Sequence, residues 1–440
     1  MKNFTYYVVV VTLLLSPLAY GKPKRNLDSD SLPVFCAIPT SITNTKARVT
    51  ADDPALKPAM AKLIQEAKET LKVGLFSVMD KATIPPSGNK HDYMSIGPYW
   101  WPDPAKKGGL PYIRRDGQIN PESEARGSDA PALERMISSV ETLALAFYLS
   151  GDEIYAGHAA QLLQTWFLNP STKMNPHLQY AQAIPGRVEG RSTGIIDARN
   201  LIHIVDANTL LASSAAWSDR DQIALVSWFD AYLEWLLNSE HGKSESRAEN
   251  NHGTWYDVQV TCYAIFVANT HLAKQVIESN KQRIGHQIQP DGRQLEELVR
   301  STSLDYSIFN LKGLFLLAGM GEQLGLDLWH YETVNLWDYA SFFSSYIQGN
   351  MPKKERNIRK ALDYVVFYGG SERTWPHPQI KASVRLLDDM PYLLRRAATV
   401  YGENGYERLL KKLLGEDAVT HRVQPLYPKL PEVNSDSRTN

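Results

Sequence analysis

The stretch LERMISSVETLALAFYLSG, residues 133–151, decides the fold class of this chain. Its apolar side chains recur at steps of three and four residues, at Leu133, Met136, Ile137, Val140, Leu143, Ala144 and Phe147. This spacing places them on one face of an α-helix, and Gly151 follows where a helix C-cap belongs. The stretch therefore predicts an amphipathic helix with one buried face.

The same period returns along most of the chain. It runs through residues 162–167, 195–211, 223–237, 258–277, 309–324, 334–347 and 392–400, with Gly, Pro, Asn or Asp between the segments. The sequence has no strand-like alternation of comparable strength, so we expect an all-α domain of helical hairpins, layered or toroidal. Residues 85–131 and 351–391 are rich in Pro, Gly and aromatics, and they are predicted to be long functional loops.

The N-terminus predicts a secretory signal. Lys2 precedes an apolar run at 6–15 and small residues at 17–21, where a signal peptidase would cut. The run is shorter than the roughly 20 residues of a membrane span, and no later segment is apolar enough to be one. We expect a secreted, periplasmic protein, and an uncleaved anchor is the alternative. The predicted division is a signal peptide at 1–21, a lead-in at 22–49, the helical domain at 50–425 and a tail at 426–440.

Composition narrows the class of protein. Hydrophobic residues make up 43% of the 440, which is enough for a large core, and the formal charge of -1 gives no general attraction to nucleic acid. The two cysteines, Cys36 and Cys262, provide no disulfide framework, and we expect them to be unpaired. The eleven histidines show no metal-binding spacing, so neither a metal nor another cofactor is predicted.

Two stretches carry side chains suited to proton chemistry beside a carboxylate. They are NNHGTWYD at 250–257 and RSTSLDY at 300–306. In a 1,4-linked uronic acid polymer, the C5 proton can be removed only when the adjacent carboxylate is neutralised. Asn251, His252 and Arg300 can donate to that carboxylate, and Tyr306 can take the proton, protonate the leaving O4, or do both.

The catalytic groups that are needed depend on the faces of the sugar ring from which the C5 hydrogen and O4 leave. In mannuronate or glucuronate the C5 hydrogen and O4 lie on the same side of the ring, so Tyr306 can serve twice. In guluronate they lie on opposite sides, and a second group is required as base. His252 fits that role best.

Several motifs together resemble the alginate lyase domain family, which includes polysaccharide lyase families 5 and 38. They are HDYMSIGPYWWPDP at 91–104, NP at 175–176, YAQAIPG at 180–186, GR at 190–191, GIID at 194–197 and NNH at 250–252. The resemblance covers roughly residues 50–400. It implies an (α/α) toroid, an incomplete α/α barrel, whose central groove binds an anionic polysaccharide, alginate or glucuronan. It also implies β-elimination without a metal.

Two departures from the family 5 pattern point towards family 38. Thr-Trp-Tyr follows Gly253 where family 5 enzymes have a Ser-Tyr-Trp type of continuation, and the arginine before Tyr306 is displaced by one residue. An alternative for Arg300 is a solvated, salt-bridged helix face with Glu296, Glu297 and Arg293.

Substrate-binding candidates lie mainly in the loops. Tyr99 and Trp100 sit in a proline-braced loop where rings can stack on sugars, or can instead plug the toroid. Arg191, Arg199 and His203 can meet carboxylates of neighbouring sugars, or can pair internally with Asp197 or Asp206. The resemblance adds Gln182 and Trp255.

Each catalytic candidate also has a structural alternative. Tyr306 fits a packed helix face, His252 fits a loop or cap, and Asn250 or Asn251 can cap a helix beginning near Thr254. Two other functions stay open. A glycoside hydrolase would use a pair of acids from Glu249, Asp257, Glu296 and Asp305. A non-catalytic glycan-binding protein would need only the aromatics and arginines.

Overall fold

The computed structural model describes residues 39–125, 127–331, 357–369 and 374–426. All of these residues belong to one compact unit, residues 32–440. The predicted signal peptide, Cys36, the predicted helix at 334–347 and most of the predicted tail lie outside the described residues.

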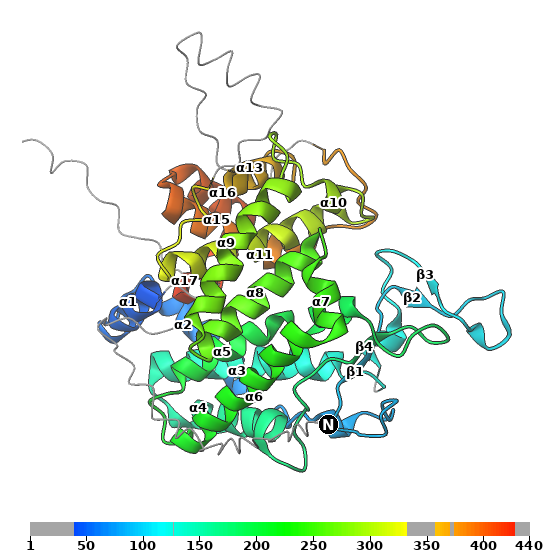
Figure 1. Ribbon diagram of the computed structural model, residues 1–440. Helices are drawn as coiled ribbons and strands as arrows, with labels where there is room; N and C mark the ends of the chain where they lie inside the picture. The colour runs from blue at the N-terminus through cyan, green and yellow to red at the C-terminus, as the bar shows by residue number, and fades with distance from the viewer. Residues whose placement is uncertain (1–38, 126, 332–356, 370–373, 427–440) are drawn as a thin grey trace, which may run out of the picture. The chain divides into compact units, whose positions relative to one another are not determined.

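Helices dominate the described chain (Figure 1). The α-helices are α1 (Pro39–Thr50), α2 (Lys57–Thr70), α3 (Ala130–Ser150), α4 (Glu153–Leu163), α5 (Ile202–Leu210), α6 (Asp219–Asn238), α7 (Glu240–Ser246), α8 (Asn251–Phe266), α9 (Thr270–Gln287), α10 (Leu295–Leu298), α11 (Ser303–Gln323), α13 (Asn357–Gly369), α14 (Arg385–Asp388), α15 (Met390–Tyr401), α16 (Asn404–Leu414) and α17 (Val423–Leu426). Short 3-10 helices span Val78–Asp80, Lys107–Gly109, Pro121–Glu124, Ser192–Leu201 and Gly415–Val419, and a π-helix spans Gln164–Leu168. The strands are β1 (Met94–Ile96), β2 (Trp100–Trp101), β3 (Ile113–Arg114) and β4 (Tyr180–Ala183).

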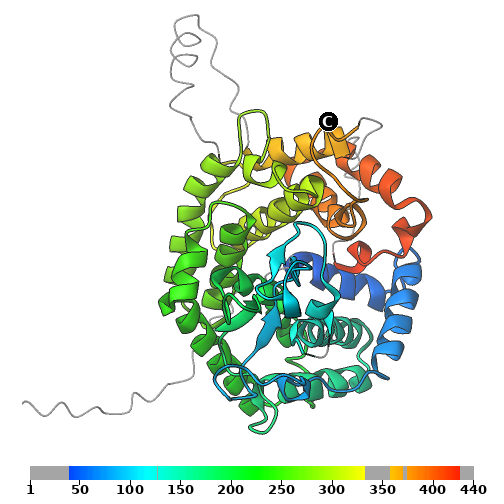
Figure 2. The ribbon, with the colours of Figure 1, turned by 90° about the vertical axis from the view of Figure 1, so that its right-hand side faces the viewer.

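The helices form an incomplete α/α toroid, as predicted. Helices adjacent in sequence pack together, such as α3 with α4, α8 with α9 and α15 with α16, while α8 also packs on α11. Figure 2 shows the helices arranged as a ring viewed from one end. The core lies between the helices, and its largest buried side chains include Trp166, Trp255, Tyr232 and Tyr263.

Residues 133–151 fold as predicted. They form most of α3, and their apolar face, from Leu133 to Phe147, is buried. Gly151 takes a positive φ of 78° at the C-cap, and its N–H donates to the carbonyl of Phe147. The predicted helices at 223–237, 309–324 and 392–400 are also present, as parts of α6, α11 and α15.

Two predictions about helix boundaries were wrong. The continuous period at 258–277 breaks after α8, where Ala268 has a φ of +64° and Asn269 caps α9 by accepting from the N–H of Leu272. Residues 351–391 were predicted to be a loop, yet they contain α13 and α14. Ile358, Ala361, Leu362 and Val365 are fully buried at helical spacing in α13, so the amphipathic signal was present but masked by the surrounding Pro, Gly and aromatic residues.

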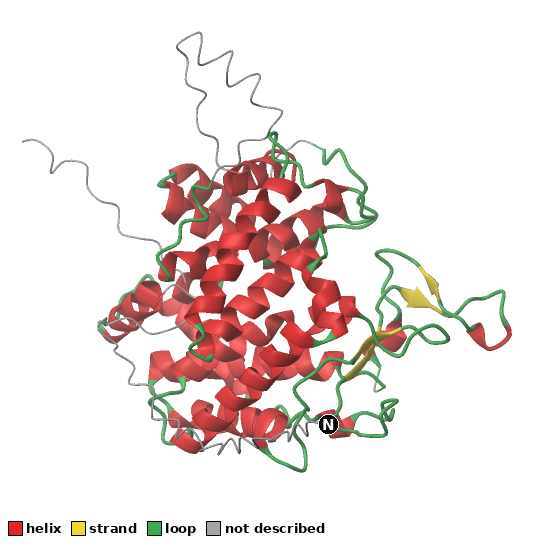
Figure 3. Ribbon diagram, viewed as in Figure 1, coloured by secondary structure: helices red, strands yellow, loops and turns green. Residues whose placement is uncertain are grey.

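The predicted loop at 85–131 holds three of the four short strands. Strand β1 pairs in parallel with β4, and β2 pairs antiparallel with β3. These strands extend from one end of the helical ring, to the right of the helices in Figure 3. Figure 2 shows this part of the chain in front of the helical ring, and Tyr99 directly precedes β2.

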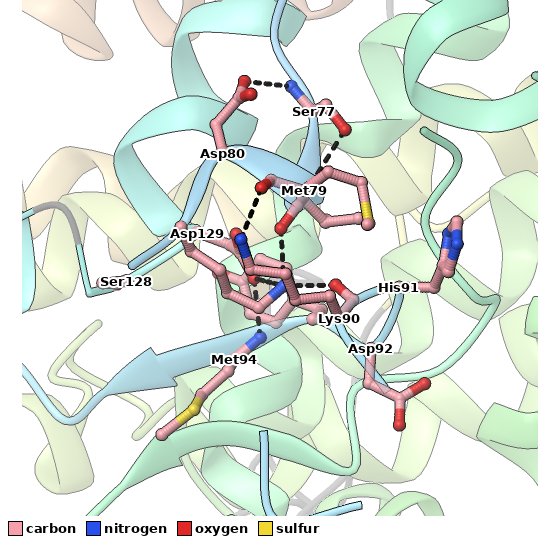
Figure 4. A network of polar contacts seen from close by, with 12 residues as sticks. Ser77, Met79, Asp80, Lys90, His91, Asp92, Met94, Ser128 and Asp129 are labelled. Atoms are coloured by element: carbon pink, nitrogen blue, oxygen red, sulfur yellow. Dashed lines mark hydrogen bonds and ion pairs between the residues drawn. The ribbon is translucent and has the colours of Figure 1, made fainter. Parts of the chain in front are cut away.

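A buried ion pair ties this loop to the helices. The Lys81 Nζ atom lies 3.1 Å from the Asp129 carboxylate, with each side chain only 1% exposed. Lys81 also donates to the carbonyls of Val78 and Lys90 at 2.7 and 2.6 Å, and Asp129 accepts from the Met94 N–H at 2.9 Å (Figure 4). Burial raises the pKa of Asp129 to about 6. The network fixes both ends of the loop relative to α3.

Candidate active site

Asn251 and His252 occupy the first turn of α8. Asn250 is the N-cap, and its side-chain oxygen accepts from the His252 N–H at 3.1 Å, so the helix begins three residues earlier than expected. Gly253 is required at the next position. A Cβ atom there would lie 2.0 Å from the Ala248 carbonyl oxygen and 2.1 Å from Arg283 Nη1. The helix start thus holds both candidates at a defined place on the ring.

Asn251 is fully buried and is hydrogen-bonded to Glu297 from α10. Its backbone N–H and its Nδ2 atom each donate to one Glu297 carboxylate oxygen, both at 2.7 Å. Its Oδ1 atom has no hydrogen-bond partner in the described part of the chain. Burial raises the pKa of Glu297 to about 7, while the two bonds from Asn251 oppose that rise. One amide hydrogen of Asn251 is committed to this contact.

His252 makes a short contact with a second buried carboxylate. Its Nδ1 atom lies 2.6 Å from Glu245 Oε1, the Glu245 side chain is 2% exposed and that of His252 is 19% exposed. The Nε2 atom has no hydrogen-bond partner among residues 39–125, 127–331, 357–369 and 374–426. The imidazole is therefore anchored on one nitrogen and free on the other.

Tyr306 lies in the first turn of α11 within a network of polar side chains. Arg300 Nη2 donates to the Tyr306 hydroxyl at 2.7 Å, and that hydroxyl donates to the Tyr99 hydroxyl at 2.9 Å. The guanidinium carbon of Arg300 also lies 3.6 Å from the Tyr306 ring centroid. Burial raises the pKa of Tyr306, and Tyr99 raises it further while Arg300 opposes. Tyr306 is thus a neutral phenol in this state.

Arg300 is held by Asp116 from the loop, not by its helical neighbours. Arg300 Nη2 donates to Asp116 Oδ1 at 2.8 Å. Burial on its own would raise the pKa of Asp116, but hydrogen bonds from Arg300 and Ser301 hold it well below its usual range. Glu297 is buried, so the alternative of a solvated, salt-bridged face does not apply to Arg300.

The four predicted catalytic residues belong to three hydrogen-bonded contacts. Asn251 donates to Glu297, His252 contacts Glu245, and Arg300 donates to Tyr306. Arg300 also follows Glu297 by three residues, and its backbone N–H donates to the Glu297 carbonyl at 3.2 Å. The connection between α10 and α11 therefore places the Arg300–Tyr306 pair next to the residue that binds Asn251.

Four predicted binding residues meet at the strands. Gln182, with a φ of +49°, donates through Nε2 to Asp197 at 2.7 Å and accepts at Oε1 from Arg191 Nη2 at 2.6 Å. The Arg191 guanidinium lies 5.9 Å from the Trp100 ring centroid, and that of Arg187 lies 5.3 Å from it. The group formed by Tyr99, Trp100, Gln182 and Arg191 therefore contacts Tyr306 through the Tyr99 hydroxyl.

Arg199, His203 and Trp255 lie elsewhere. They line a cavity of about 470 Å³, whose lining includes none of the four catalytic candidates. Trp255 is 1% exposed, with its ring centroid 4.9 Å from that of Phe309. The Arg199 guanidinium lies 5.6 Å from the Phe309 ring centroid, and burial lowers the pKa of His203, whose Nδ1 lies 3.6 Å from Glu141. Trp255 and Phe309 follow His252 and Tyr306 by one helical turn.

Sequence reasoning missed three carboxylates that hold the candidates. Glu245 and Glu297 contact His252 and Asn251, and Asp116 contacts Arg300. Glu245 carried no signal, because its seven-residue separation from His252 crosses a break between two helices. Asp116 lies 184 residues before Arg300. The sequence indicates Glu297 only as a helical neighbour of Arg300.

The acids considered for a hydrolase have other partners where they are buried. Asp257 pairs with Arg283 at 2.8 Å and accepts from Asn280, and Asp305 accepts from Gln379 and Ser383. Glu249 and Glu296 are exposed. This arrangement gives no support to a hydrolytic acid pair.

Among residues 39–125, 127–331, 357–369 and 374–426, no helix combines the length and apolar character that crossing a membrane requires. Among the same residues, no group of three or more His, Cys, Asp or Glu side chains is arranged to hold a metal ion. Cys262 is a buried free thiol.

Comparison with known proteins shows the family of the chain. The family described as alginate lyase matches residues 77–352. A crystal structure of an alginate lyase from Bacteroides ovatus is 38% identical, covers 91% of this chain and 100% of its own, and superimposes with a TM-score of 0.82. Alginate lyase A1-III from Sphingomonas species A1 shares the fold at 14% identity, covering 87% of this chain and 93% of its own, with a TM-score of 0.50.

A variant of A1-III in complex with a tetrasaccharide shares the fold at 14% identity, with 92% and 99% coverage and a TM-score of 0.54. No curated protein sequence matches the chain. The match over most of the chain and the 38% identity to a solved alginate lyase are sufficient for assignment. The chain belongs to the alginate lyase family and is a polysaccharide lyase.

Proposed function

We propose that this lyase cleaves alginate, or a related 1,4-linked glucuronan, by β-elimination without a metal ion. The observation that carries the proposal is the hydrogen bond of 2.7 Å from Arg300 to the Tyr306 hydroxyl, with Asn251 bound to Glu297, three residues before Arg300, and His252 bound to Glu245. A phenol beside a guanidinium can give up its proton at a reacting oxygen and remain stabilised as a phenolate. That is the behaviour an elimination requires.

Tyr306 serves as general acid towards O4 in this scheme. Its raised pKa keeps the proton on the phenol until the leaving oxygen becomes basic. For residues whose C5 hydrogen and O4 leave from the same face, Tyr306 first loses its proton to solvent, takes the C5 proton as a phenolate and then passes it to O4. Arg300 stabilises the phenolate that this role needs.

Asn251, His252 and Arg300 neutralise the substrate carboxylate. Arg300 uses Nε and Nη2 on Asp116 and Tyr306, and its Nη1 has no hydrogen-bond partner among the described residues. Asn251 uses one amide hydrogen on Glu297, and the other is assigned to the substrate carboxylate. These donors are prepositioned for charge that grows in the transition state.

Tyr99, Trp100, Gln182 and Arg191 bind the neighbouring sugars. The Arg187 and Arg191 guanidiniums lie 5.3 and 5.9 Å from the Trp100 ring centroid, and neither forms an ion pair with a carboxylate in the described chain. A polyuronan carries one carboxylate per sugar, so rings and unpaired guanidiniums match its repeating pattern. Arg199, His203 and Trp255 are proposed as a more distant contact region within the cavity of about 470 Å³.

The predicted signal peptide supports secretion into the periplasm, where an extracellular polymer would be met after transport. Digestion of alginate and of glucuronan, followed by ultraviolet absorbance of the unsaturated product, tests the reaction type. Growth of that absorbance supports elimination. New reducing ends without it would indicate hydrolysis, and binding without cleavage would indicate a glycan-binding protein.

A further inference from the structure

The β2–β3 hairpin has two faces, and the proposed function uses only one of them. Across the antiparallel pair, Trp100 lies opposite Arg114, and Trp101 lies opposite Ile113. Successive residues of a strand point to opposite faces, so Trp100 and Arg114 share one face while Trp101 and Ile113 share the other. The second face has no role in the proposed binding of substrate.

A ring and a guanidinium meet on this second face. Arg115 follows Ile113 by two residues, and its guanidinium carbon lies 5.1 Å from the Trp101 ring centroid. The Trp101 Nε1 atom donates to the Gln118 carbonyl at 2.9 Å, which fixes the indole. Both Trp101 and Arg115 are partly exposed, and Arg115 forms no ion pair with a carboxylate in the described chain. We call this pair the Trp101 face.

The Trp101 face repeats the chemistry of the Trp100 face with different residues. The Arg187 and Arg191 guanidiniums lie 5.3 and 5.9 Å from the Trp100 ring centroid. An indole beside a guanidinium suits a carboxylated pyranose, because the ring can pack on the apolar C–H face of the sugar while the guanidinium binds its carboxylate. Each face of the hairpin therefore offers the groups that recognise a uronate.

The hairpin is also positively charged, although the chain as a whole has a formal charge of -1. Residues 99–119 contain two carboxylates and four cationic side chains, Lys106, Lys107, Arg114 and Arg115. One of the carboxylates, Asp116, is already paired with Arg300. Figures 1 and 3 show the hairpin projecting away from the helices, and both lysines are exposed. A polyanion in solution is attracted to such a projecting cationic segment.

We propose that Trp101 and Arg115 form a second uronan-binding site, which holds one segment of a polymer while another segment occupies the catalytic groove. The inference rests on the proposed function, because it takes the polymer to be the substrate. Once one segment is bound, binding of the other becomes intramolecular, and the effective concentration of substrate at the groove rises. An oligomer too short to reach both sites gains nothing.

A purely structural contact between Trp101 and Arg115 would behave differently. The Arg115 N–H donates to the Tyr99 carbonyl at 2.8 Å, and the Tyr99 hydroxyl accepts from Tyr306. If the contact only held the hairpin in shape, its loss would displace Tyr99 and impair the groove for every substrate. A binding role instead predicts a loss confined to long polymers.

The first experiment compares a long uronan with a uronate tetrasaccharide in steady-state kinetics of the full chain. Arg115→Gln and Trp101→Ala should each raise KM for the polymer by roughly three- to tenfold, because the second point of attachment is lost. The kcat on the polymer and both constants for the tetrasaccharide should stay close to those of the wild type. An equal loss on both substrates would show a structural role and overturn the inference.

Arg220→Gln is the matched control for charge. It removes an exposed guanidinium from the first turn of α6, far along the chain from the hairpin, and should leave all constants unchanged. A rise in KM as large as that of Arg115→Gln would mean that only net charge matters, and this would contradict a site at Trp101.

The second experiment measures binding without turnover. In a Tyr306→Phe background the polymer stays intact, and migration of the protein is followed in native gels that contain the uronan. Addition of Arg115→Gln or Trp101→Ala should reduce the retardation, whereas addition of Arg115→Lys, which keeps the charge, should preserve most of it. Calorimetric affinity for the tetrasaccharide should be the same in all of these proteins. Undiminished retardation in both of the first two variants would overturn the inference.

The outcomes distinguish this inference from the proposed function. A wild-type protein that releases no unsaturated product from any uronan contradicts the proposed function itself. A wild-type protein that cleaves the polymer, with Arg115→Gln and Trp101→Ala variants that bind and cleave it equally well, contradicts only the second site.

Discussion

The hydroxyl groups of Tyr306 and Tyr99 are 2.9 Å apart and hydrogen-bonded, although 207 residues separate them in sequence. Tyr306 comes from helix α11, and Tyr99 comes from the loop that the Lys81–Asp129 ion pair anchors. The hydrogen bond connects helix α11 of the ring to the loop at residues 85–131. The hydroxyl proposed as the general acid therefore has its hydrogen-bond acceptor only when this loop is in place.

Replacing Tyr306 with Phe should lower kcat on a uronan by at least roughly 10²-fold, because only the ionisable oxygen is removed while the ring still packs. Substrate affinity should change little. Initial rates from ultraviolet absorbance, with calorimetric binding of an oligouronide, provide the measurement. A variant that retains more than about a tenth of wild-type turnover would show that another group is the acid.

Asn251→Ala and His252→Ala should each depress kcat more than they raise KM, because both residues stabilise charge that grows in the transition state. Steady-state kinetics on the same polymer measure the two constants separately. If one of the substitutions raised KM alone, the residue concerned would be a ground-state contact.

The pKa of Glu297 predicts a pH dependence of stability. Burial raises this pKa from 4.5 to about 7. Between those values the folded protein keeps a proton that the unfolded chain has released, so the contribution of Glu297 to the free energy of unfolding falls as pH rises. The full decrease is about 3 kcal/mol. Denaturant unfolding of wild type and Glu297→Gln at pH 5 and pH 8 measures it.

Wild type should lose more stability than Glu297→Gln between these two pH values. Glu296→Gln, at the exposed neighbouring position, should behave as wild type. Identical pH dependence in all three proteins would mean that Glu297 stays ionised throughout the range.

Arg199→Gln tests whether the cavity of about 470 Å³ contacts substrate. We expect KM for a long uronan to rise several-fold with kcat unchanged, because the guanidinium lines a cavity that includes none of the four catalytic candidates and offers a site for a carboxylate. Short oligomers that do not reach the cavity should be unaffected. A change in kcat at constant KM would instead indicate that Arg199 acts through the Phe309 ring that it covers.

Chelation should leave the rate essentially unchanged, since Asn251, His252 and Arg300 already neutralise the carboxylate that a cation would otherwise bind. Activity is compared before and after exhaustive chelator treatment and dialysis. A loss restored by calcium and not by buffer would contradict this scheme, unless melting curves show that the cation only stabilises the fold.

The sequence by itself determined the fold class and named candidates for the reacting groups. The periodic apolar face of residues 133–147 requires burial against other helices, and repetition of that period leaves a toroid or layered bundle as the solution. Asn251, His252, Arg300 and Tyr306 could be named in advance because their functional groups suit one reaction. Local periodicity could not place the break at Ala268, where the backbone reverses to a positive φ within a continuing apolar pattern.

Only the tertiary structure decided how these groups are held and which are neighbours. Glu245, Glu297 and Asp116 reach their partners across helix breaks or from a distant loop, and hydrogen bonds of this kind leave no periodic trace in a sequence. Tertiary packing also places Arg199 and His203 in a cavity apart from Tyr306, although their side chains are of the same types as Arg300 and His252. Residue type sets what a side chain can do, but packing in three dimensions sets what it can reach and in which protonation state.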